Sequence, residues 1–227
     1  MNIVLKVGGS ILFENGRVKV ERISQYVSLI KSLQAEGHSI AVIVGGGAPA
    51  REYSKVAREL GASFTIQDKL GIEASRMNAR LFQSAFDNAY PNPPTSFDEL
   101  QVALSTHELV FVGGIQPGQS TNAVAALVAE LTRADWLFNC SNIDFVYDKD
   151  PSLNHDAKPF DKLTYSQFID IVNNLEQKPS GYALFDLVGA KIVQRSKIRL
   201  CFVNGKDPEN VIRVLKGENK GTVVYDE

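Results

Sequence analysis

Three glycine-rich segments stand out as candidates for ligand binding. They are Gly8-Gly9-Ser10, Gly45-Gly46-Gly47 and the longer stretch Gly113 to Thr121, and each follows a short run of apolar, mostly β-branched residues. Glycine lets backbone N–H groups approach a ligand closely, and a helix that starts after such a loop favours an anion at its N-terminus. Each glycine pair alone is also typical of a tight turn. Together, the three segments predict a site for several phosphate groups.

Three charged residues near these segments suggest how phosphates would be held. Lys6 lies inside the first apolar run, where a lysine is costly unless it is paired, so it either reaches water at the strand end or neutralises phosphate oxygens. Arg51 lies one turn into the helix expected after the triple glycine and could contact the same anion, although alone it is typical of a solvated helix. Asp68 either accepts hydrogen bonds from a ribose or caps the next helix.

Two standard nucleotide-binding motifs would give these segments a different interpretation. The sequence contains no G-x-x-x-x-G-K-[ST], which excludes a P-loop enzyme. Gly45 to Ala50 matches the dinucleotide pattern G-x-G-x-x-[GA], and Asp68 lies near the distance at which an acidic residue ends the second strand. However, Arg58 to Gln67 does not resemble a strand, and a dinucleotide site leaves the other two glycine segments unexplained. The dinucleotide interpretation therefore ranks second.

Alternating strand and helix patterns indicate how the segments are positioned. Strands are predicted at Ile3 to Val7, Ser39 to Val44, Leu109 to Val112, Trp136 to Asn139, Arg199 to Val203 and Thr222 to Tyr225. Helices are predicted around Ile23 to Leu33, Ile72 to Ala89 and Asp207 to Gly217, and after the capping boxes Ser96/Glu99 and Thr164/Gln167. This alternation predicts an α/β fold, a three-layer αβα sandwich with a mostly parallel central sheet. The glycine segments would then share the carboxyl edge of the sheet, where ligands bind.

Composition limits the remaining classes. The 227 residues, 44% apolar and 22% charged, predict one domain over residues 1–227. A net charge of −2 argues against nucleic acid and membrane surfaces as partners, and the apolar runs are too short to cross a bilayer. No signal peptide is visible and Cys140 and Cys201 are isolated, which predicts a cytoplasmic protein. The three histidines lack ligand spacing, so no protein-bound metal is expected.

A family resemblance covers essentially the whole chain. The three glycine segments resemble those of the amino acid kinase superfamily and within it the archaeal uridylate (UMP) kinases. The same resemblance extends to Asp68 to Ile72, Ser141 to Pro151 and Ala190 to Ile198. Gln116 to Thr121, followed by Ala123 to Ala129, is the most specific piece. The resemblance implies transfer of the γ-phosphoryl group of ATP to UMP with Mg²⁺, in cytoplasmic pyrimidine nucleotide biosynthesis, by a homo-oligomer that is typically a hexamer.

The resemblance also implies roles for individual residues. Lys6 and Arg51 would be the catalytic cations, and Lys191 is a weaker candidate. ATP would contact Gly9, Ser10, Gly47, Arg51, Ser141, Asn142, Tyr147 and Asp150. UMP would contact Gly46, Asp68, Ile115, Gln116, Pro117, Gly118, Gln119, Ser120 and Thr121. Residues 1–130 would mostly form the acceptor half and residues 131–227 the ATP half.

Several positions depart from the family pattern. Ser141 replaces the usual Thr, Phe145 replaces a Gly beside the expected adenine site, and Asn122 stands where much of the superfamily has Asp, so no catalytic carboxylate is assigned there. Two alternatives stay open. One is the same fold with a carbamate, carboxylate or isopentenyl phosphate acceptor, against which Asp68 and residues 115–121 argue. The other is a non-catalytic nucleotide sensor, which would not need Lys6.

Overall fold

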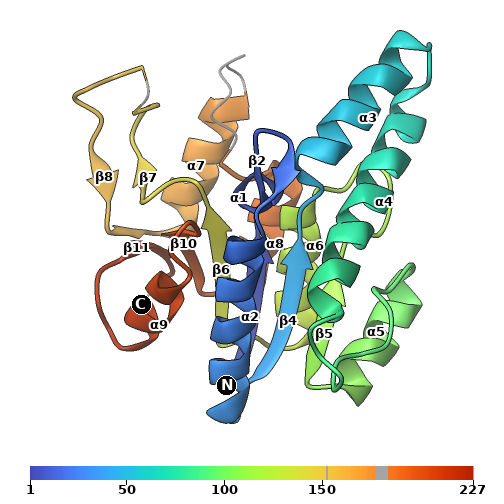
Figure 1. Cartoon of the computed structure of the whole chain (residues 1–227). Coiled ribbons are helices and arrows are strands. Elements are labelled where there is room, and N and C mark those ends of the chain that lie inside the picture. Colours follow the sequence, from blue (N-terminus) through green and yellow to red (C-terminus); the bar gives the residue numbers. More distant parts are fainter. Residues whose placement is uncertain (152, 177–183, 227) are drawn as a thin grey trace.

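A seven-stranded sheet forms the centre of the computed structural model, which describes residues 1–151, 153–176 and 184–226 (Figure 1). The strand order is β5-β4-β1-β6-β10-β11-β9, and every neighbouring pair is parallel except β10 and β11. The sheet strands are β1 (Asn2–Val7), β4 (Ser39–Val44), β5 (Leu109–Val112), β6 (Trp136–Ser141), β9 (Lys162–Leu163), β10 (Leu200–Asn204) and β11 (Gly221–Val224). Two small hairpins pair β2 (Phe13–Glu14) with β3 (Arg17–Val18), and β7 (Val146–Tyr147) with β8 (Pro159–Phe160).

Helices cover both faces of the sheet, as expected from the near-continuous apolar strands. They are α1 (Gly9–Leu12), α2 (Val20–Ala35), α3 (Gly47–Glu59), α4 (Phe64–Gln83), α5 (Phe97–Thr106), α6 (Thr121–Leu131), α7 (Tyr165–Glu176), α8 (Leu187–Arg195) and α9 (Glu209–Leu215). Helices α3 and α4 form an antiparallel pair that rises beyond the sheet (Figure 1). None of the helices in the described ranges is long and apolar enough to cross a membrane.

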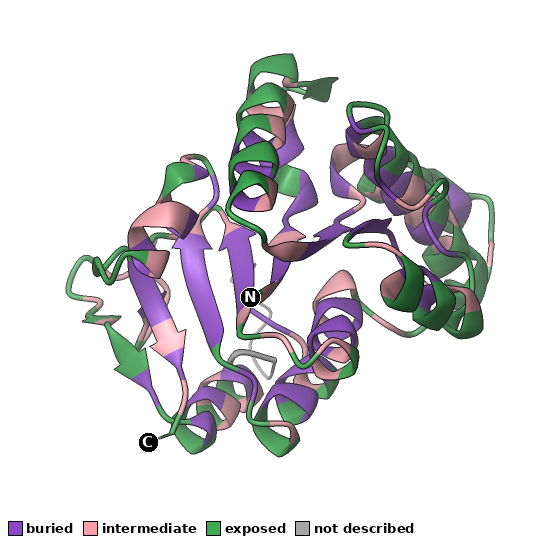
Figure 2. Ribbon diagram, turned by 90° about the horizontal axis from the view of Figure 1, so that it is seen from below, coloured by how far each residue is buried: buried purple, intermediate pink, exposed green. Residues whose placement is uncertain are grey.

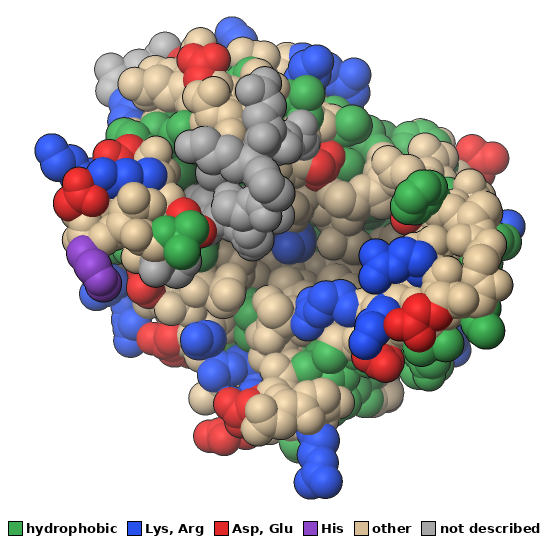
Figure 3. Space-filling model, turned by 90° about the horizontal axis from the view of Figure 1, so that it is seen from above, with side chains coloured by type: hydrophobic (Ala, Val, Ile, Leu, Met, Phe, Trp, Pro, Cys, Tyr) green, Lys and Arg blue, Asp and Glu red, His purple; other side chains and the backbone are tan. Residues whose placement is uncertain are grey.

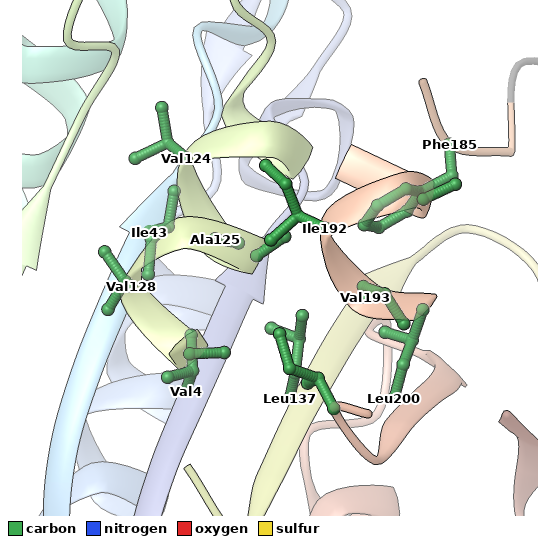
Figure 4. Packing of buried hydrophobic residues seen from close by; sticks show 14 of the residues in the cluster. Val4, Ile43, Val124, Ala125, Val128, Leu137, Phe185, Ile192, Val193 and Leu200 are labelled. Carbon is green, nitrogen blue, oxygen red and sulfur yellow. The ribbon is translucent and has the colours of Figure 1, made fainter. Parts of the chain in front are cut away.

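Two apolar layers hold the sheet between these helices. On one face, α2, α4 and α9 pack on side chains such as Leu5 and Phe138. On the other, Val124 and Val128 of α6 and Ile192 of α8 pack on the strands (Figure 4). Figure 2 shows the result, with buried strands enclosed by helices whose outer faces are exposed. The predicted three-layer αβα sandwich with a mostly parallel sheet is confirmed.

Two predictions about elements need correction. The helix expected from Ile72 to Ala89 runs from Phe64 to Gln83, and Phe86 and Ala89 are buried in the turns that follow it. Apolar spacing continues past the helix end because those turns still pack on the core. The strand predicted at the C-terminus is present but antiparallel to β10, because a short connection through α9 returns the chain along β10.

Both capping boxes are confirmed, since Glu99 N–H donates to Ser96 and Gln167 N–H donates to Thr164.

The chain reverses its strand order at the centre of the sheet. From β1 it proceeds through β4 to β5 on one side, and it returns with β6 and β10 on the other side of β1. In open α/β sheets, ligands bind outside the carboxyl ends of the strands at such a reversal. The segments after β1, β4, β5 and β6 all reach this edge, which is where the three glycine segments were expected to meet.

Candidate active site

The segments after β1 and β4 are packed backbone against backbone. A Cβ atom added to Gly9 would lie 2.1 Å from the Gly47 backbone nitrogen, and one added to Gly45 would lie 2.6 Å from the Gly9 nitrogen. Gly47 also has a φ of +65°, a conformation that residues with side chains rarely adopt. The glycines therefore allow the two loop backbones to approach so closely that no side chain could fit between them.

Polar side chains of α4 hold the backbone of the segments that follow β4 and β5. The Ser75 hydroxyl accepts a hydrogen bond from Gly114 N–H at 2.7 Å, and Arg76 donates to the carbonyls of Gly114 at 3.0 Å and Ile115 at 3.2 Å. Asn78 donates to the Gly45 carbonyl at 2.8 Å. The sequence analysis missed Ser75, Arg76 and Asn78. The only signal for them is three polar residues on a helix face that the fold buries or half-buries.

Asp68 lies in a cavity of about 660 Å³ between α3, α4 and the segment after β5. We call it the Asp68 cavity. Its lining residues are Gly46, Ala50, Arg51, Ser54, Lys55, Arg58, Gln67, Asp68, Gly71, Ile72, Ser75, Gly114, Gln116, Gly118, Gln119, Ser120 and Thr121. Figure 3 looks down on this edge and shows a hollowed surface with basic side chains gathered beside it. Three basic residues line this cavity against one acidic residue, so its charge suits an anion.

Asp68 itself is the fifth residue of α4 and does not cap the helix. The N-cap position is Ser63, and one carboxylate oxygen of Asp68 accepts a hydrogen bond from Gly118 N–H at 2.8 Å. The capping interpretation is therefore wrong, and Asp68 instead connects α4 to the segment after β5. The dinucleotide interpretation is also wrong, because Arg58 to Gln67 contains the end of α3 and the start of α4 and no strand.

Lys6 lies in a second cavity, of about 750 Å³, at the strand-order reversal. We call it the Lys6 cavity. Its lining residues are Lys6, Gly8, Gly9, Ser10, Gly45, Gly46, Gly47, Arg51, Thr121, Asn122, Asn139, Ser141, Asn142, Ile143, Asp150, Pro151, Leu153 and Leu184. Gly46, Arg51 and Thr121 line both cavities, so the two open into each other beside Arg51. Two ligands bound in them would therefore meet near Arg51 and Lys6.

Among the described residues, Lys6 is the only lysine that lines this cavity, and its surroundings alter its pKa. Burial lowers the pKa of Lys6 from 10.5 to about 8, while Asp186 acts in the opposite direction. Asp186 caps α8 by accepting from Gly189 N–H at 2.9 Å, and it also accepts from the Ser120 hydroxyl that caps α6. The N-termini of α3 and α6 also line this cavity and favour an anion there, whereas the N-terminus of α8 is capped by Asp186.

Three residues that line the Lys6 cavity each have a buried polar oxygen with no hydrogen-bond partner among the described residues. They are Asn122 Oδ1, Asn139 Oδ1 and Ser141 Oγ. Buried polar groups in proteins are nearly always paired, so these acceptors are suited to a donor supplied by a ligand or by a side chain that moves. His, Cys, Asp and Glu residues within the described ranges form no group that could hold a metal by themselves.

Most of the predicted site residues meet at these two cavities. The Lys6 cavity is lined by Lys6, Gly9, Ser10, Gly47, Ser141, Asn142 and Asp150. The Asp68 cavity is lined by Asp68, Gln116, Gly118, Gln119 and Ser120. Both cavities are lined by Gly46, Arg51 and Thr121. Pro117 and Ile115 line a neighbouring groove instead, together with Ile72. Tyr147 lies in the β7–β8 hairpin and lines neither cavity. A further cavity of about 410 Å³ at the opposite edge of the sheet holds none of them.

Known proteins share this architecture and sequence. Residues 1–204 match the model of the amino acid kinase family. The chain is 41% identical to a uridylate kinase of Methanocaldococcus jannaschii over 99% of both chains, and 44% identical to one of Hyperthermus butylicus over 98% of this chain and 97% of the other. The crystal structure of the uridylate kinase from Archaeoglobus fulgidus superposes with a TM-score of 0.87 at 41% identity, covering 99% of this chain and 100% of that chain. The chain therefore belongs to the amino acid kinase family, among its uridylate kinases.

Proposed function

We propose that this chain is a UMP kinase that transfers the γ-phosphoryl group of ATP to UMP, giving ADP and UDP. The observation that carries the proposal is the pair of adjacent cavities, which share Arg51 and one of which is lined by Lys6. UMP occupies the Asp68 cavity, and ATP occupies the Lys6 cavity. The relatives at 41–44% identity support this choice of acceptor over carbamate, carboxylate or isopentenyl phosphate.

In this mechanism, a phosphate oxygen of UMP attacks the γ-phosphorus of ATP while the bond to the β-phosphate oxygen breaks. The acceptor is already an anion, so no general base is needed, and positioning and charge neutralisation do the catalytic work. Arg51 holds phosphate oxygens from both substrates, and the Lys6 ammonium stabilises the charge on the moving phosphoryl group. The N–H groups of the glycine segments and the helix N-termini bind the remaining phosphate oxygens.

Mg²⁺ enters this scheme bound to ATP. The described residues offer no cluster of acidic ligands, whereas the unpaired Asn122 Oδ1 and Ser141 Oγ are suited to accept hydrogen bonds from metal-bound water. When bound, the ion neutralises part of the phosphate charge. Asn142 and Asp150 lie in the same cavity and would line the adenosine side.

The two proposed substrate sites draw on different parts of the chain. All lining residues of the Asp68 cavity fall between positions 46 and 121, which supports residues 1–130 as the acceptor half of one domain. The Lys6 cavity draws on Lys6 to Arg51 as well as on residues 121–184, so the ATP site extends beyond the half 131–227. We place the reaction in pyrimidine nucleotide (UTP and CTP) biosynthesis in the cytoplasm. The two buried free thiols, Cys140 and Cys201, fit a reducing compartment.

An acceptor screen tests the activity directly. We expect UMP to give the highest rate of ADP release when compared with CMP, dUMP, carbamate and isopentenyl phosphate, because Asp68 lines a cavity of about 660 Å³ together with Gln116 and Gly118 to Thr121. The measurement is a coupled assay with ATP and Mg²⁺. Faster turnover with a non-nucleotide acceptor would replace UMP in the proposal. Nucleotide binding without turnover of any acceptor would identify a sensor.

The assembly is expected to be a homohexamer, as in the family the chain resembles. The α3–α4 pair exposes large apolar side chains near its tip, including Leu60 at 82% and Phe64 at 81% exposure, which favours contact with another copy. Light scattering should give six times the chain mass of 24.9 kDa. Leu60→Glu combined with Phe64→Glu should reduce the mass, whereas Val188→Glu, at an exposed position on α8, serves as the matched control. A stable wild-type monomer at working concentration would refute the prediction.

A further inference from the structure

Asn139 has a buried amide oxygen beside Lys6 that the mechanism so far leaves unused. We propose that Asn139 is a positioning residue for phosphoryl transfer: its Oδ1 accepts a hydrogen bond from the Lys6 ammonium when substrate phosphates draw that group into the cavity. The inference rests on the proposed kinase activity, in which Lys6 supplies the positive charge. Asn139 acts through Lys6 and contacts no reacting atom.

The register of the sheet places the two side chains together. Lys6 of β1 is directly paired with Asn139 of β6 at the strand-order reversal, and both residues line the Lys6 cavity. Paired residues on neighbouring strands project from the same face of a sheet, with the strands about 4.8 Å apart. Asn139 is 1% exposed, so solvent cannot satisfy its oxygen. A buried acceptor without a partner destabilises the fold, which makes the nearby ammonium a favourable donor for it.

The other groups around Lys6 are both charged and neutral. Asp186, at the start of α8, attracts the ammonium electrostatically and accepts hydrogen bonds from Gly189 and Ser120, and Asn122, from α6, is neutral. Burial raises the pKa of the Cys140 thiol to about 12, so it carries no charge at neutral pH.

The remaining charges in the cavity are Arg51, from α3, and Asp150, from the segment after β7. Arg51 is a cation and repels the ammonium. Because burial lowers the Lys6 pKa to about 8, the ammonium form prevails at neutral pH by a smaller margin than for an exposed lysine, and an acceptor for it matters.

Two substitutions with opposite effects test the proposal. The kcat/KM for ATP of the wild type should fall above a pH of about 8, where free Lys6 loses its proton. Asn139→Leu removes the acceptor that the ammonium meets in the substrate complex, so the alkaline limb of its kcat profile, which reports that complex, should move to lower pH by roughly half a unit to one unit. The kcat should fall about tenfold with an unchanged KM for UMP. Asn139→Asp adds a negative charge, which favours the ammonium, so its limb should move to higher pH.

A structural role would give a different pattern. Asn139→Leu removes a buried unpaired oxygen and should melt no lower than the wild type, so lost activity cannot then be ascribed to unfolding. If it fails to fold, Asn139→Ser, whose hydroxyl is too short to reach, replaces it. An alkaline limb that stays at the wild-type pH in both the apolar variant and Asn139→Asp would overturn the proposal. Absence of UDP formation by the wild type would instead refute the kinase activity itself.

Discussion

Lys6→Met should lower kcat by roughly 100-fold or more while it raises the melting temperature. The loss of rate is expected because the variant lacks the charge that stabilises the moving phosphoryl group. Lys6 lines the ATP side of the junction and not the Asp68 cavity, so the affinity for UMP should be nearly unchanged. Methionine keeps the length of the side chain, which limits the change to the ammonium group.

The gain in stability follows from the lowered pKa. Folding moves the Lys6 pKa from 10.5 to about 8, so at neutral pH the native state holds a charge that burial disfavours. A difference of this size corresponds to about 3 kcal/mol, and each kcal/mol raises Tm by about 2–4 °C in a chain of this length. Between pH 8 and 10.5 the unfolded chain binds more protons than the native chain, so this contribution makes wild-type stability rise with pH. Lys6→Met should lack that rise.

Calorimetry and steady-state kinetics on the same preparations provide the measurement. Lys220→Met, the same substitution at an exposed position before β11, should change neither kcat nor Tm appreciably. A kcat of Lys6→Met within a few-fold of the wild-type value would show that Lys6 is only a strand residue that reaches water. In that case Arg51 and the helix N-termini would have to supply the charge stabilisation.

Asp68→Asn should weaken UMP binding by about tenfold to a hundredfold, which corresponds to roughly 1–3 kcal/mol. One carboxylate oxygen already accepts from Gly118 N–H at 2.8 Å, which leaves the other for a ribose hydroxyl of UMP. The amide of Asn has a single acceptor oxygen, so either the loop or the ribose loses its partner. Binding of a non-hydrolysable ATP analogue should be little affected, because Asp68 does not line the Lys6 cavity.

Calorimetric titrations with UMP and with the ATP analogue separate these effects. Glu52→Gln is the matched control, since it removes one carboxylate charge from an exposed position on α3 that lines neither cavity. Asp68 is not a helix cap, so the melting temperature of Asp68→Asn should stay close to that of the wild type. Unchanged UMP affinity in this variant would remove Asp68 from the acceptor site and assign it only to loop attachment.

The sequence predicts β1, β4 and β5 well because each combines an apolar run with a following glycine segment. The Ile3 to Val7 and Leu109 to Val112 predictions match β1 and β5 to within one residue. Helix ends are harder. The apolar spacing that continues through Phe86 extends the predicted helix too far. A residue buried in a turn is apolar just as one buried in a helix is, so the sequence does not distinguish the two.

The site is predictable where glycines and charges share an edge of the sheet, and unpredictable where function depends on tertiary contacts. Ser75, Arg76 and Asn78 bind loop backbone 32 to 39 residues away in the chain, and no local spacing reports such contacts. The significance of Asn139 is equally hidden, because it emerges only when β6 pairs with β1. Ile115 and Pro117 show the opposite error, since a contiguous motif does not tell which side chains face the ligand.

The backbone contact between Gly9 and Gly47 also limits how this protein can change over generations. Gly16, Gly37 and Gly61 have positive φ values but open space around the Cβ position, so Asn or Asp can replace them at the cost of mild strain. Gly9 and Gly45 have no such freedom, because even a methyl group would collide with backbone atoms that cannot turn aside. A library of random variants selected for growth should therefore accept substitutions at the exposed turns while it retains glycine at both positions of this backbone contact.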